Sequence, residues 1–158
     1  MAEIEDYDFS TGDAGASHVY PMEAGQIRVG GYMCIKGKPC KVSAVSTSKT
    51  GKHGHAKCNF TAIDIFTGKK YEDIVPSTHS TNIPNVTRKE YSLLDISEDD
   101  FCSLMDENGE TREDVKLPES DLARDIREQF DAGKSLAVSV MAAMGHEQII
   151  AIKEDTQN

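Results

Sequence analysis

Residues 40–66 read CKVSAVSTSKTGKHGHAKCNFTAIDIF, a polar centre between two more apolar runs. The runs CKVSAVST (40–47) and AKCNFTAIDIF (56–66) are rich in Val, Ile, Phe and Thr, which β-strands favour. The centre is rich in Gly, Lys and His, and it is far longer than the two residues that suffice to join antiparallel strands. The pattern predicts one β-hairpin with an unusually long polar tip.

The rest of the first half predicts further short strands. From Val19 to about Asn82, runs of Val, Ile, Tyr and Phe alternate with turn signals such as Gly37-Lys38-Pro39 and Thr67-Gly68. Residues 1–16 hold five acids and no bases. Because their apolar side chains are few, they cannot offset the entropy of ordering. We therefore expect a disordered acidic tail followed by a small all-β unit.

The second half predicts a separate domain. In STNIPNVTRK (80–89), Pro84 and two Asn interrupt the strand pattern and the composition then turns acidic, so we expect a domain boundary there. Further strands are expected at 90–97, 101–106, 111–117, 135–144 and 147–153, with tight turns at Asn108-Gly109 and Gly145-His146.

One helix is predicted between these strands. Ser120 can cap it, Leu122, Ile126 and Phe130 recur at helical spacing, and Gly133 can end it. We interpret this stripe, together with Tyr91 and Phe101, as core packing. Three strands, a helix and two strands is the order of an OB-type barrel, a fold that often binds single-stranded nucleic acid. The fold class predicted is all-β with one notable helix.

The charge is unevenly distributed. The net charge of −10 argues against a nucleic-acid partner, since binding to phosphate depends on Lys and Arg. Residues 17–84, however, hold nine bases and four acids, whereas residues 85–158 hold eight bases and eighteen acids. A basic middle between acidic ends keeps RNA binding open for the first domain.

The hydropathy pattern and the cysteines indicate the cellular compartment. No run approaches the roughly 18 apolar residues that span a bilayer, and the acidic start is unlike a signal peptide, so we expect a cytosolic or nuclear protein without a membrane partner. The sequence has four cysteines and no C-x-x-C pair, so they are expected to be small buried or half-buried hydrophobes: Cys34, Cys40, Cys58 and Cys102.

The residues of the polar tip lack what several common kinds of site require. A phosphate-binding nucleotide loop fails, because Ser46 and His53 stand where Gly and a hydroxyl residue are required. A zinc site from His53, His55 and Cys58 lacks a fourth ligand and lies among lysines. A catalytic Cys/His pair lacks a carboxylate to orient it. A plain solvated turn remains open, although an arm this long and basic suits an anionic crevice, with Lys52 between two glycines as its most accessible residue.

The segment TGKHGHAK (50–57) resembles the hypusine site of the eukaryotic translation initiation factor 5A family, and residues 46–49 fit as well. The resemblance extends to FSTGDAGAS (9–17), to PMEAGQIRVGGYMCIKGKPCKV (21–42) and to the acidic second half. It implies an acidic tail at 1–16, an SH3-like β-barrel at 17–83 that carries the hypusine loop (46–57), and an OB-fold barrel at 84–158.

By this resemblance Lys52 is a substrate and not a catalyst. Deoxyhypusine synthase would transfer an aminobutyl group from spermidine to its side-chain nitrogen, and deoxyhypusine hydroxylase would add a hydroxyl. No other cofactor and no metal is implied, and the protein is not an enzyme. The loop residues expected to present hypusine or contact RNA are Lys49, Thr50, Gly51, His53, Gly54, His55 and Lys57.

The resemblance also implies a function. The protein is expected to bind the ribosome between the peptidyl and exit sites, where hypusine would contact the acceptor end of peptidyl-tRNA. It would promote peptide bond formation at stalled, proline-rich sequences and translation termination. Two alternatives remain at this stage: a general single-stranded RNA-binding module in RNA transport or turnover, and a metal-dependent enzyme, which would require bound zinc.

Overall fold

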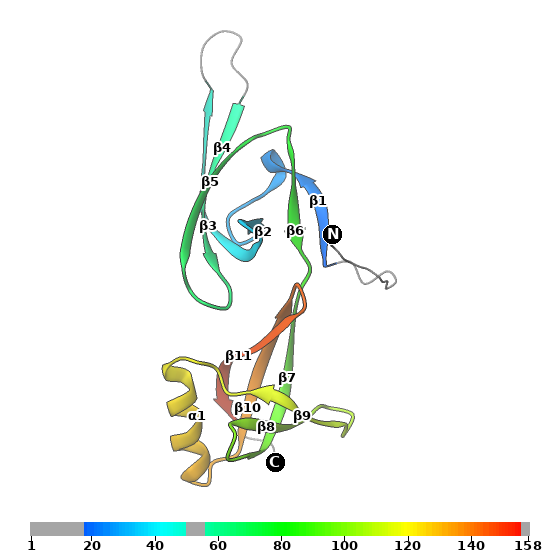
Figure 1. Cartoon of the computed structure of the whole chain (residues 1–158), viewed down its shortest axis with the longest axis vertical. Coiled ribbons are helices and arrows are strands. Elements are labelled where there is room, and N and C mark those ends of the chain that lie inside the picture. Colours follow the sequence, from blue (N-terminus) through cyan, green and yellow to red (C-terminus); the bar gives the residue numbers. More distant parts are fainter. Residues whose placement is uncertain (1–17, 50–55, 156–158) are drawn as a thin grey trace. The chain divides into compact units, whose positions relative to one another are not determined.

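The structure, a computed structural model, describes residues 18–49 and 56–155. The chain forms two compact units that divide between Asn85 and Val86 (Figure 1). Strands make up most of both, and the described residues include one α-helix. The predicted fold class is therefore confirmed. The acidic tail lies outside the described residues, and the domain limits at 16/17 and 83/84 stay predictions.

Unit 1 is built from strands that curl into a half-barrel. A four-stranded sheet has the order β2-β3-β4-β5, and β1 pairs with β6 in a separate two-stranded sheet. A 3-10 turn, Ala24–Gln26, follows β1. The strands are β1 (Val19–Glu23), β2 (Tyr32–Ile35), β3 (Lys38–Lys49), β4 (Ala56–Asp64), β5 (Lys70–Pro76) and β6 (Ser80–Pro84).

The predicted hairpin is β3 and β4. The two strands pair antiparallel from Cys40, which lies opposite Asp64, to Lys49, which lies opposite Ala56. A register shift between Val42 and Ala44 bends the pair, as a β-bulge does. The long strands of this hairpin lead to the segment that the sequence singled out (Figure 1).

The core of unit 1 fills the inner face of this sheet. Phe60 and Met33 are its largest fully buried side chains. Cys40 and Cys58 are also buried, Cys34 is half-buried and Cys102 is buried in unit 2; none of the four is in a disulfide. The prediction that the cysteines act as small hydrophobes is confirmed.

Unit 2 has the strand and helix order of an OB-fold. Its five-stranded sheet has the order β11-β10-β7-β8-β9, so that β9 and β11 are the two edge strands. The elements are β7 (Val86–Ile96), β8 (Phe101–Met105), β9 (Thr111–Lys116), α1 (Asp121–Asp131), β10 (Leu136–Ala143) and β11 (His146–Glu154).

Residues 80–89 differ from the expectation drawn from composition. The sequence suggested that the strand pattern breaks there, whereas β6 runs to Pro84 and β7 starts at Val86. Only Asn85 lies between the two strands. Pro84 is tolerated because it occupies the last position of a strand, where a missing N–H costs little.

The predicted helix is confirmed in detail. The Ser120 hydroxyl accepts a hydrogen bond from the Leu122 N–H at 3.3 Å, and Gly133 beyond the helix has φ +85°. Ile126 is fully buried, and Leu122 and Phe130 pack against the same core.

Two aromatic residues of unit 2 behave differently from one another. Tyr91 is buried, as expected, with 8% of its surface exposed. Phe101 was wrongly assigned to the core, because 37% of its surface is exposed. Strand alternation explains this, since Cys102 and Leu104 on β8 take the inward positions and the intervening residues face outward.

Candidate functional site

The root of the arm is formed by the ends of β3 and β4. Lys49 is the last residue of β3, Lys57 is the second of β4, and both are exposed. Lys49 lies opposite Ala56, while Lys57 lies opposite Ser48 in the next row. Because neighbouring rows of a sheet face opposite sides, the two ammonium groups flank the root on its two faces.

The other predicted site residues lie outside the described residues: Thr50, Gly51, Lys52, His53, Gly54 and His55. Their expected roles therefore stay predictions, and the structure bears on them only through the root from which they extend.

The root is firmly held on the side of β4. β5 pairs with β4 as far as Lys57, which lies opposite Pro76, and the Ser77 N–H donates to the Ala56 carbonyl oxygen at 2.9 Å. Cys58, one residue further along β4, is only 3% exposed. The paired strands thus remain ordered up to the last described residues on each side, and they form a rigid base for whatever the arm carries.

The buried thiols have low reactivity. Burial, together with the nearby carboxylate of Asp64, raises the pKa of Cys40 to about 11. Burial likewise raises the pKa of Cys102 to about 11. Thiols of this kind are protonated at neutral pH and are poor nucleophiles and metal ligands. Among residues 18–49 and 56–155, no group of three His, Cys, Asp or Glu side chains is arranged to hold a metal ion.

The two units differ in how many of their lysines and arginines form ion pairs. In the described part of the chain, every ion pair lies in unit 2: Lys89 with Asp106, Arg112 with Asp114 and Glu147, Arg127 with Asp100, and Lys153 with Glu90. The described lysines of unit 1, including Lys49 and Lys57, have no carboxylate oxygen of a described residue within 4.0 Å. Cations available to an outside anion are therefore concentrated in unit 1.

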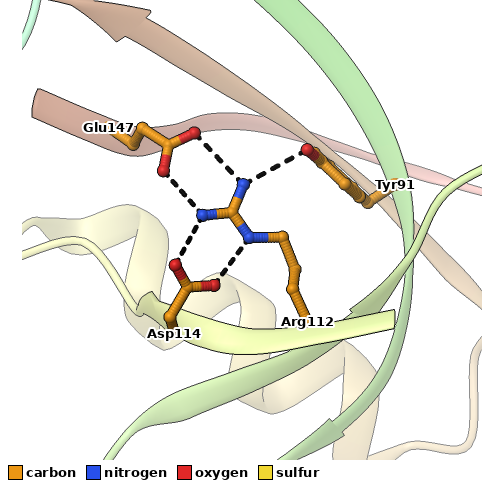
Figure 2. Close-up of polar contacts among 4 residues, drawn as sticks. All are labelled: Tyr91, Arg112, Asp114 and Glu147. Atoms are coloured by element: carbon orange, nitrogen blue, oxygen red, sulfur yellow. Dashed lines mark hydrogen bonds and ion pairs between the residues drawn. The ribbon is translucent and has the colours of Figure 1, made fainter. Parts of the chain in front are cut away.

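Sequence reasoning missed the densest of these ion pairs. The Arg112 guanidinium donates to the Asp114 carboxylate at 2.6 and 2.7 Å, to Glu147 at 2.6 and 3.1 Å, and to the Tyr91 hydroxyl at 3.3 Å (Figure 2). Hydrogen bonds to Asp114 and Glu147 raise the pKa of Arg112, and the hydrogen bond from Arg112 lowers the pKa of Asp114. The available signal was the i, i+2 spacing of Arg112 and Asp114, which puts both on one face of a strand.

No helix among residues 18–49 and 56–155 is both long and apolar enough to cross a membrane.

Two family models match the chain, one for each unit. Residues 17–79 match "Translation initiation factor 5A-like, N-terminal". Residues 85–153 match "Eukaryotic elongation factor 5A hypusine, DNA-binding OB fold". Together they cover the root of the arm, the arm itself and the OB-fold.

Curated relatives match over nearly the whole chain. Eukaryotic translation initiation factor 5A-1 of Arabidopsis thaliana is 60% identical over 151 residues, which are 95% of this chain and 96% of that protein. Eukaryotic translation initiation factor 5A-4 of Solanum tuberosum is 60% identical over 155 residues, which are 98% of each.

Solved structures share the fold. A translation initiation factor eif-5a family protein from Naegleria fowleri superposes with a TM-score of 0.82 at 56% identity, covering 87% of this chain and 99% of that one. Eukaryotic translation initiation factor 5A from Methanococcus jannaschii gives 0.66 at 29% identity, covering 86% and 96%. The chain therefore belongs to the eukaryotic translation initiation factor 5A family, whose members are hypusine-containing translation factors and not enzymes.

Proposed function

We propose that Lys52 is converted to hypusine by deoxyhypusine synthase and deoxyhypusine hydroxylase, and that the modified side chain contacts the acceptor end of peptidyl-tRNA on the ribosome. From a place between the peptidyl and exit sites, it promotes peptide bond formation at stalled, proline-rich sequences and translation termination. This work takes place in the cytoplasm, and passage through the nucleus stays a prediction.

One observation supports the proposal above all: the sequence TGKHGHAK (50–57) lies within the residues that the family model matches, and it connects β3 to β4 at the end of their hairpin. Lys49 and Lys57 stand on either face of that end without a carboxylate partner among the described residues. A hairpin end with two exposed lysines can bind in an anionic crevice such as an RNA groove, because phosphates attract exposed ammonium groups.

The modification adds reach and donors, not charge sign. An ordinary lysine has a pKa of about 10.4 and is already cationic at neutral pH. The added aminobutyl segment brings a second amine and a hydroxyl, so one slender side chain can hydrogen-bond several sugar and phosphate oxygens. Holding the tRNA end in a reactive orientation lowers the barrier by positioning the reactants, while the ribosome performs the chemistry.

A reconstituted translation system with polyproline-encoding messages tests the proposal. The wild-type protein, first checked for hypusine by peptide mass spectrometry across residues 50–57, should relieve the stall. Lys52→Arg keeps the charge but cannot be extended, so it should lose the stimulation. Lys49→Arg and Lys57→Arg are matched controls that should keep most of it. Full activity of Lys52→Arg would overturn the proposal.

A general single-stranded RNA-binding module is the second candidate, and one observation favours it. Phe101 is exposed on the OB-fold, with the Lys116 ammonium 5.4 Å from the centre of its ring. Exposed aromatic rings with a nearby cation can stack on bases. Binding to free RNA that survives Lys52→Ala but is lost in Phe101→Ala would favour this candidate over the first.

A further inference from the structure

A second basic surface lies at the end of unit 1 opposite the arm. We name it the turn patch, and it consists of Lys36, Lys69, Lys70 and Tyr71. These four residues, with Glu72, line a shallow hollow of about 530 Å³. Lys36 belongs to the turn between β2 and β3, Lys69 to the connection between β4 and β5, and Lys70 is the first residue of β5. The arm leaves from the other ends of β3 and β4.

The turn between β2 and β3 holds Lys36 in an unfavourable backbone conformation. Ile35 lies opposite Lys38, so the turn consists of two residues, Lys36 and Gly37, with φ of 53° and 75°. Positive φ at both positions is the pattern of a type I′ turn, which prefers Asn or Gly at the first. A lysine in the left-handed region costs on the order of 1 kcal/mol. The turn thus sets the direction in which the Lys36 side chain leaves the backbone, and this side chain lines the hollow.

The connection between β4 and β5 is fixed by a buried carboxylate. Asp64 is only 4% exposed and accepts hydrogen bonds from the N–H groups of Phe66 at 2.8 Å and Thr67 at 3.2 Å. The Thr67 hydroxyl in turn accepts from the Lys69 N–H at 3.2 Å, and the Lys69 carbonyl oxygen accepts from the Asp64 N–H at 2.8 Å. Lys69 is therefore held by a hydrogen-bonded turn, and Lys70 by the pairing of β5 with β4.

The charges of the turn patch are not neutralised within the described residues. No carboxylate oxygen there lies within 4.0 Å of the ammonium groups of Lys36, Lys69 or Lys70, although Glu72 lines the same hollow. The Lys69 ammonium lies 5.6 Å from the centre of the Tyr71 ring. Three exposed lysines and an aromatic ring that line one hollow match the repeated phosphates and the bases of a nucleic acid.

We propose that the turn patch binds phosphates of an RNA segment distinct from the one that the arm reaches. The 12 residues of β3 span up to about 36 Å at roughly 3.3 Å per residue step, so the turn patch lies up to that far from Lys49 at the other end of the strand. The hairpin thus holds RNA at both ends. The inference rests on the proposed function in one respect, that the chain acts on the ribosome; it does not depend on the modification of Lys52.

Ribosome binding as a function of salt tests the proposal. The probes are vacant 80S ribosomes and free tRNA, which separate ribosomal RNA from tRNA as the source of phosphate. The triple variant Lys36→Gln/Lys69→Gln/Lys70→Gln should bind one of these two probes about 10- to 100-fold more weakly at 100 mM salt, and that probe carries the RNA that the turn patch contacts. For the same probe, the magnitude of the slope of log K against log[salt] should fall by about 2 to 3. The matched control is Arg88→Gln/Arg124→Gln/Lys134→Gln in unit 2, which removes the same charge and should change the slope by less than about 1.

The measurement is repeated in a Lys52→Ala background, which lacks hypusine. The turn-patch effect should persist there, so that failure of the proposed function and failure of this inference are distinguishable. Unchanged urea midpoints would show that both triple variants fold. Equal salt slopes for the turn-patch and control variants would overturn the inference. So would binding of the turn patch to polyglutamate in preference to RNA, which would identify an acidic protein as the partner.

Discussion

Arg112 and Glu147 join the two edge strands of the OB-fold sheet, with Nη2 of the guanidinium 2.6 Å from Oε1 of the carboxylate. Arg112 lies on β9 and Glu147 on β11, which have no strand ladder between them in the described sheet. A barrel is usually closed by backbone hydrogen bonds. Here, side chains connect the two edges at this point.

Arg112→Gln should destabilise unit 2 by about 1 to 3 kcal/mol, because it leaves two carboxylates facing each other without their shared cation. The estimate is kept low since Asp114 and Glu147 are 67% and 40% exposed and water screens them. Urea unfolding of the full chain, followed by amide signals of β9 and β11, measures the change. Arg124→Gln, on the exposed side of α1, should stay within about 0.5 kcal/mol. An equal effect of both substitutions would show that Arg112 is not a special contact.

The contribution of Arg112 should disappear in acid. Its hydrogen bond lowers the pKa of Asp114 from the ordinary 3.8, so the folded state holds this carboxylate charged more readily than the unfolded state. Stability from this pair is present above pH 3.8 and is lost as the pH falls through the lowered folded-state pKa. The difference in unfolding free energy between wild type and Arg112→Gln should be constant from about pH 5 to 8 and shrink below about pH 4. A difference that grows in acid would contradict this assignment.

Asp64→Ala should destabilise unit 1 by about 1 to 3 kcal/mol, because two backbone N–H groups of the β4–β5 connection lose their acceptor. Asp64→Asn keeps an acceptor oxygen and should cost less. Hydrogen exchange of the Phe66 and Thr67 amides is the direct measurement, and both should exchange faster in Asp64→Ala. Unchanged protection of these amides would mean that the turn does not depend on Asp64.

Lys36→Asn should separate stability from binding. It creates the Asn-Gly pair that a type I′ turn prefers, so unit 1 should gain about 0.5 to 1 kcal/mol. It also removes one ammonium from the turn patch, so the salt slope of ribosome binding should fall by about 1. Lys38→Asn, two residues along the chain, is the comparison that should give no stabilisation. If Lys36→Asn is more stable than the wild type but binds the ribosome equally tightly, Lys36 contributes to the turn and not to binding.

Lys49→Gln/Lys57→Gln should weaken ribosome binding at low salt and reduce the salt slope by about 2, in hypusine-containing and unmodified protein alike. The urea midpoint should stay unchanged, since both side chains are exposed and have no ion pair among the described residues. A reduced effect of hypusine with an unchanged slope would instead mean that these lysines only orient the loop.

Local sequence signals predicted the elements of this fold well. The Ser120 cap, the spacing of Leu122 and Ile126, and Gly133 act within a few residues of one another, and the helix forms where they place it. The prediction for residues 80–89 was wrong, because Pro and Asn were taken to interrupt the strand pattern. In the structure, Pro84 is the last residue of β6, where no backbone N–H donor is needed. Phe101 misled for a different reason, since the inward face of a short strand depends on its partners.

The site was predictable only in part. The polar tip and Lys52 stand out because glycine, lysine and histidine cluster in one continuous segment. The turn patch does not, because Lys36 and Lys69 come from turns more than thirty residues apart and meet only through the register of β3 with β2 and β4. Glu147 and Arg112 are likewise far apart in sequence and meet across the sheet edges. Pairing between distant strands cannot be read from composition.

The pairing of cations inside unit 2 has an electrical consequence. Unit 2 has a surplus of acids, and four of its eight arginines and lysines are held in ion pairs, whereas the described lysines of unit 1 have no carboxylate partner among the described residues. Along the chain, a basic stretch at 17–84 therefore stands between acidic stretches at 1–16 and 85–158. An RNA-rich particle attracts the exposed cations of residues 17–84 and repels the acidic stretches on either side of them. A protein with this charge distribution can approach a polyanion in the productive orientation despite a net charge of −10.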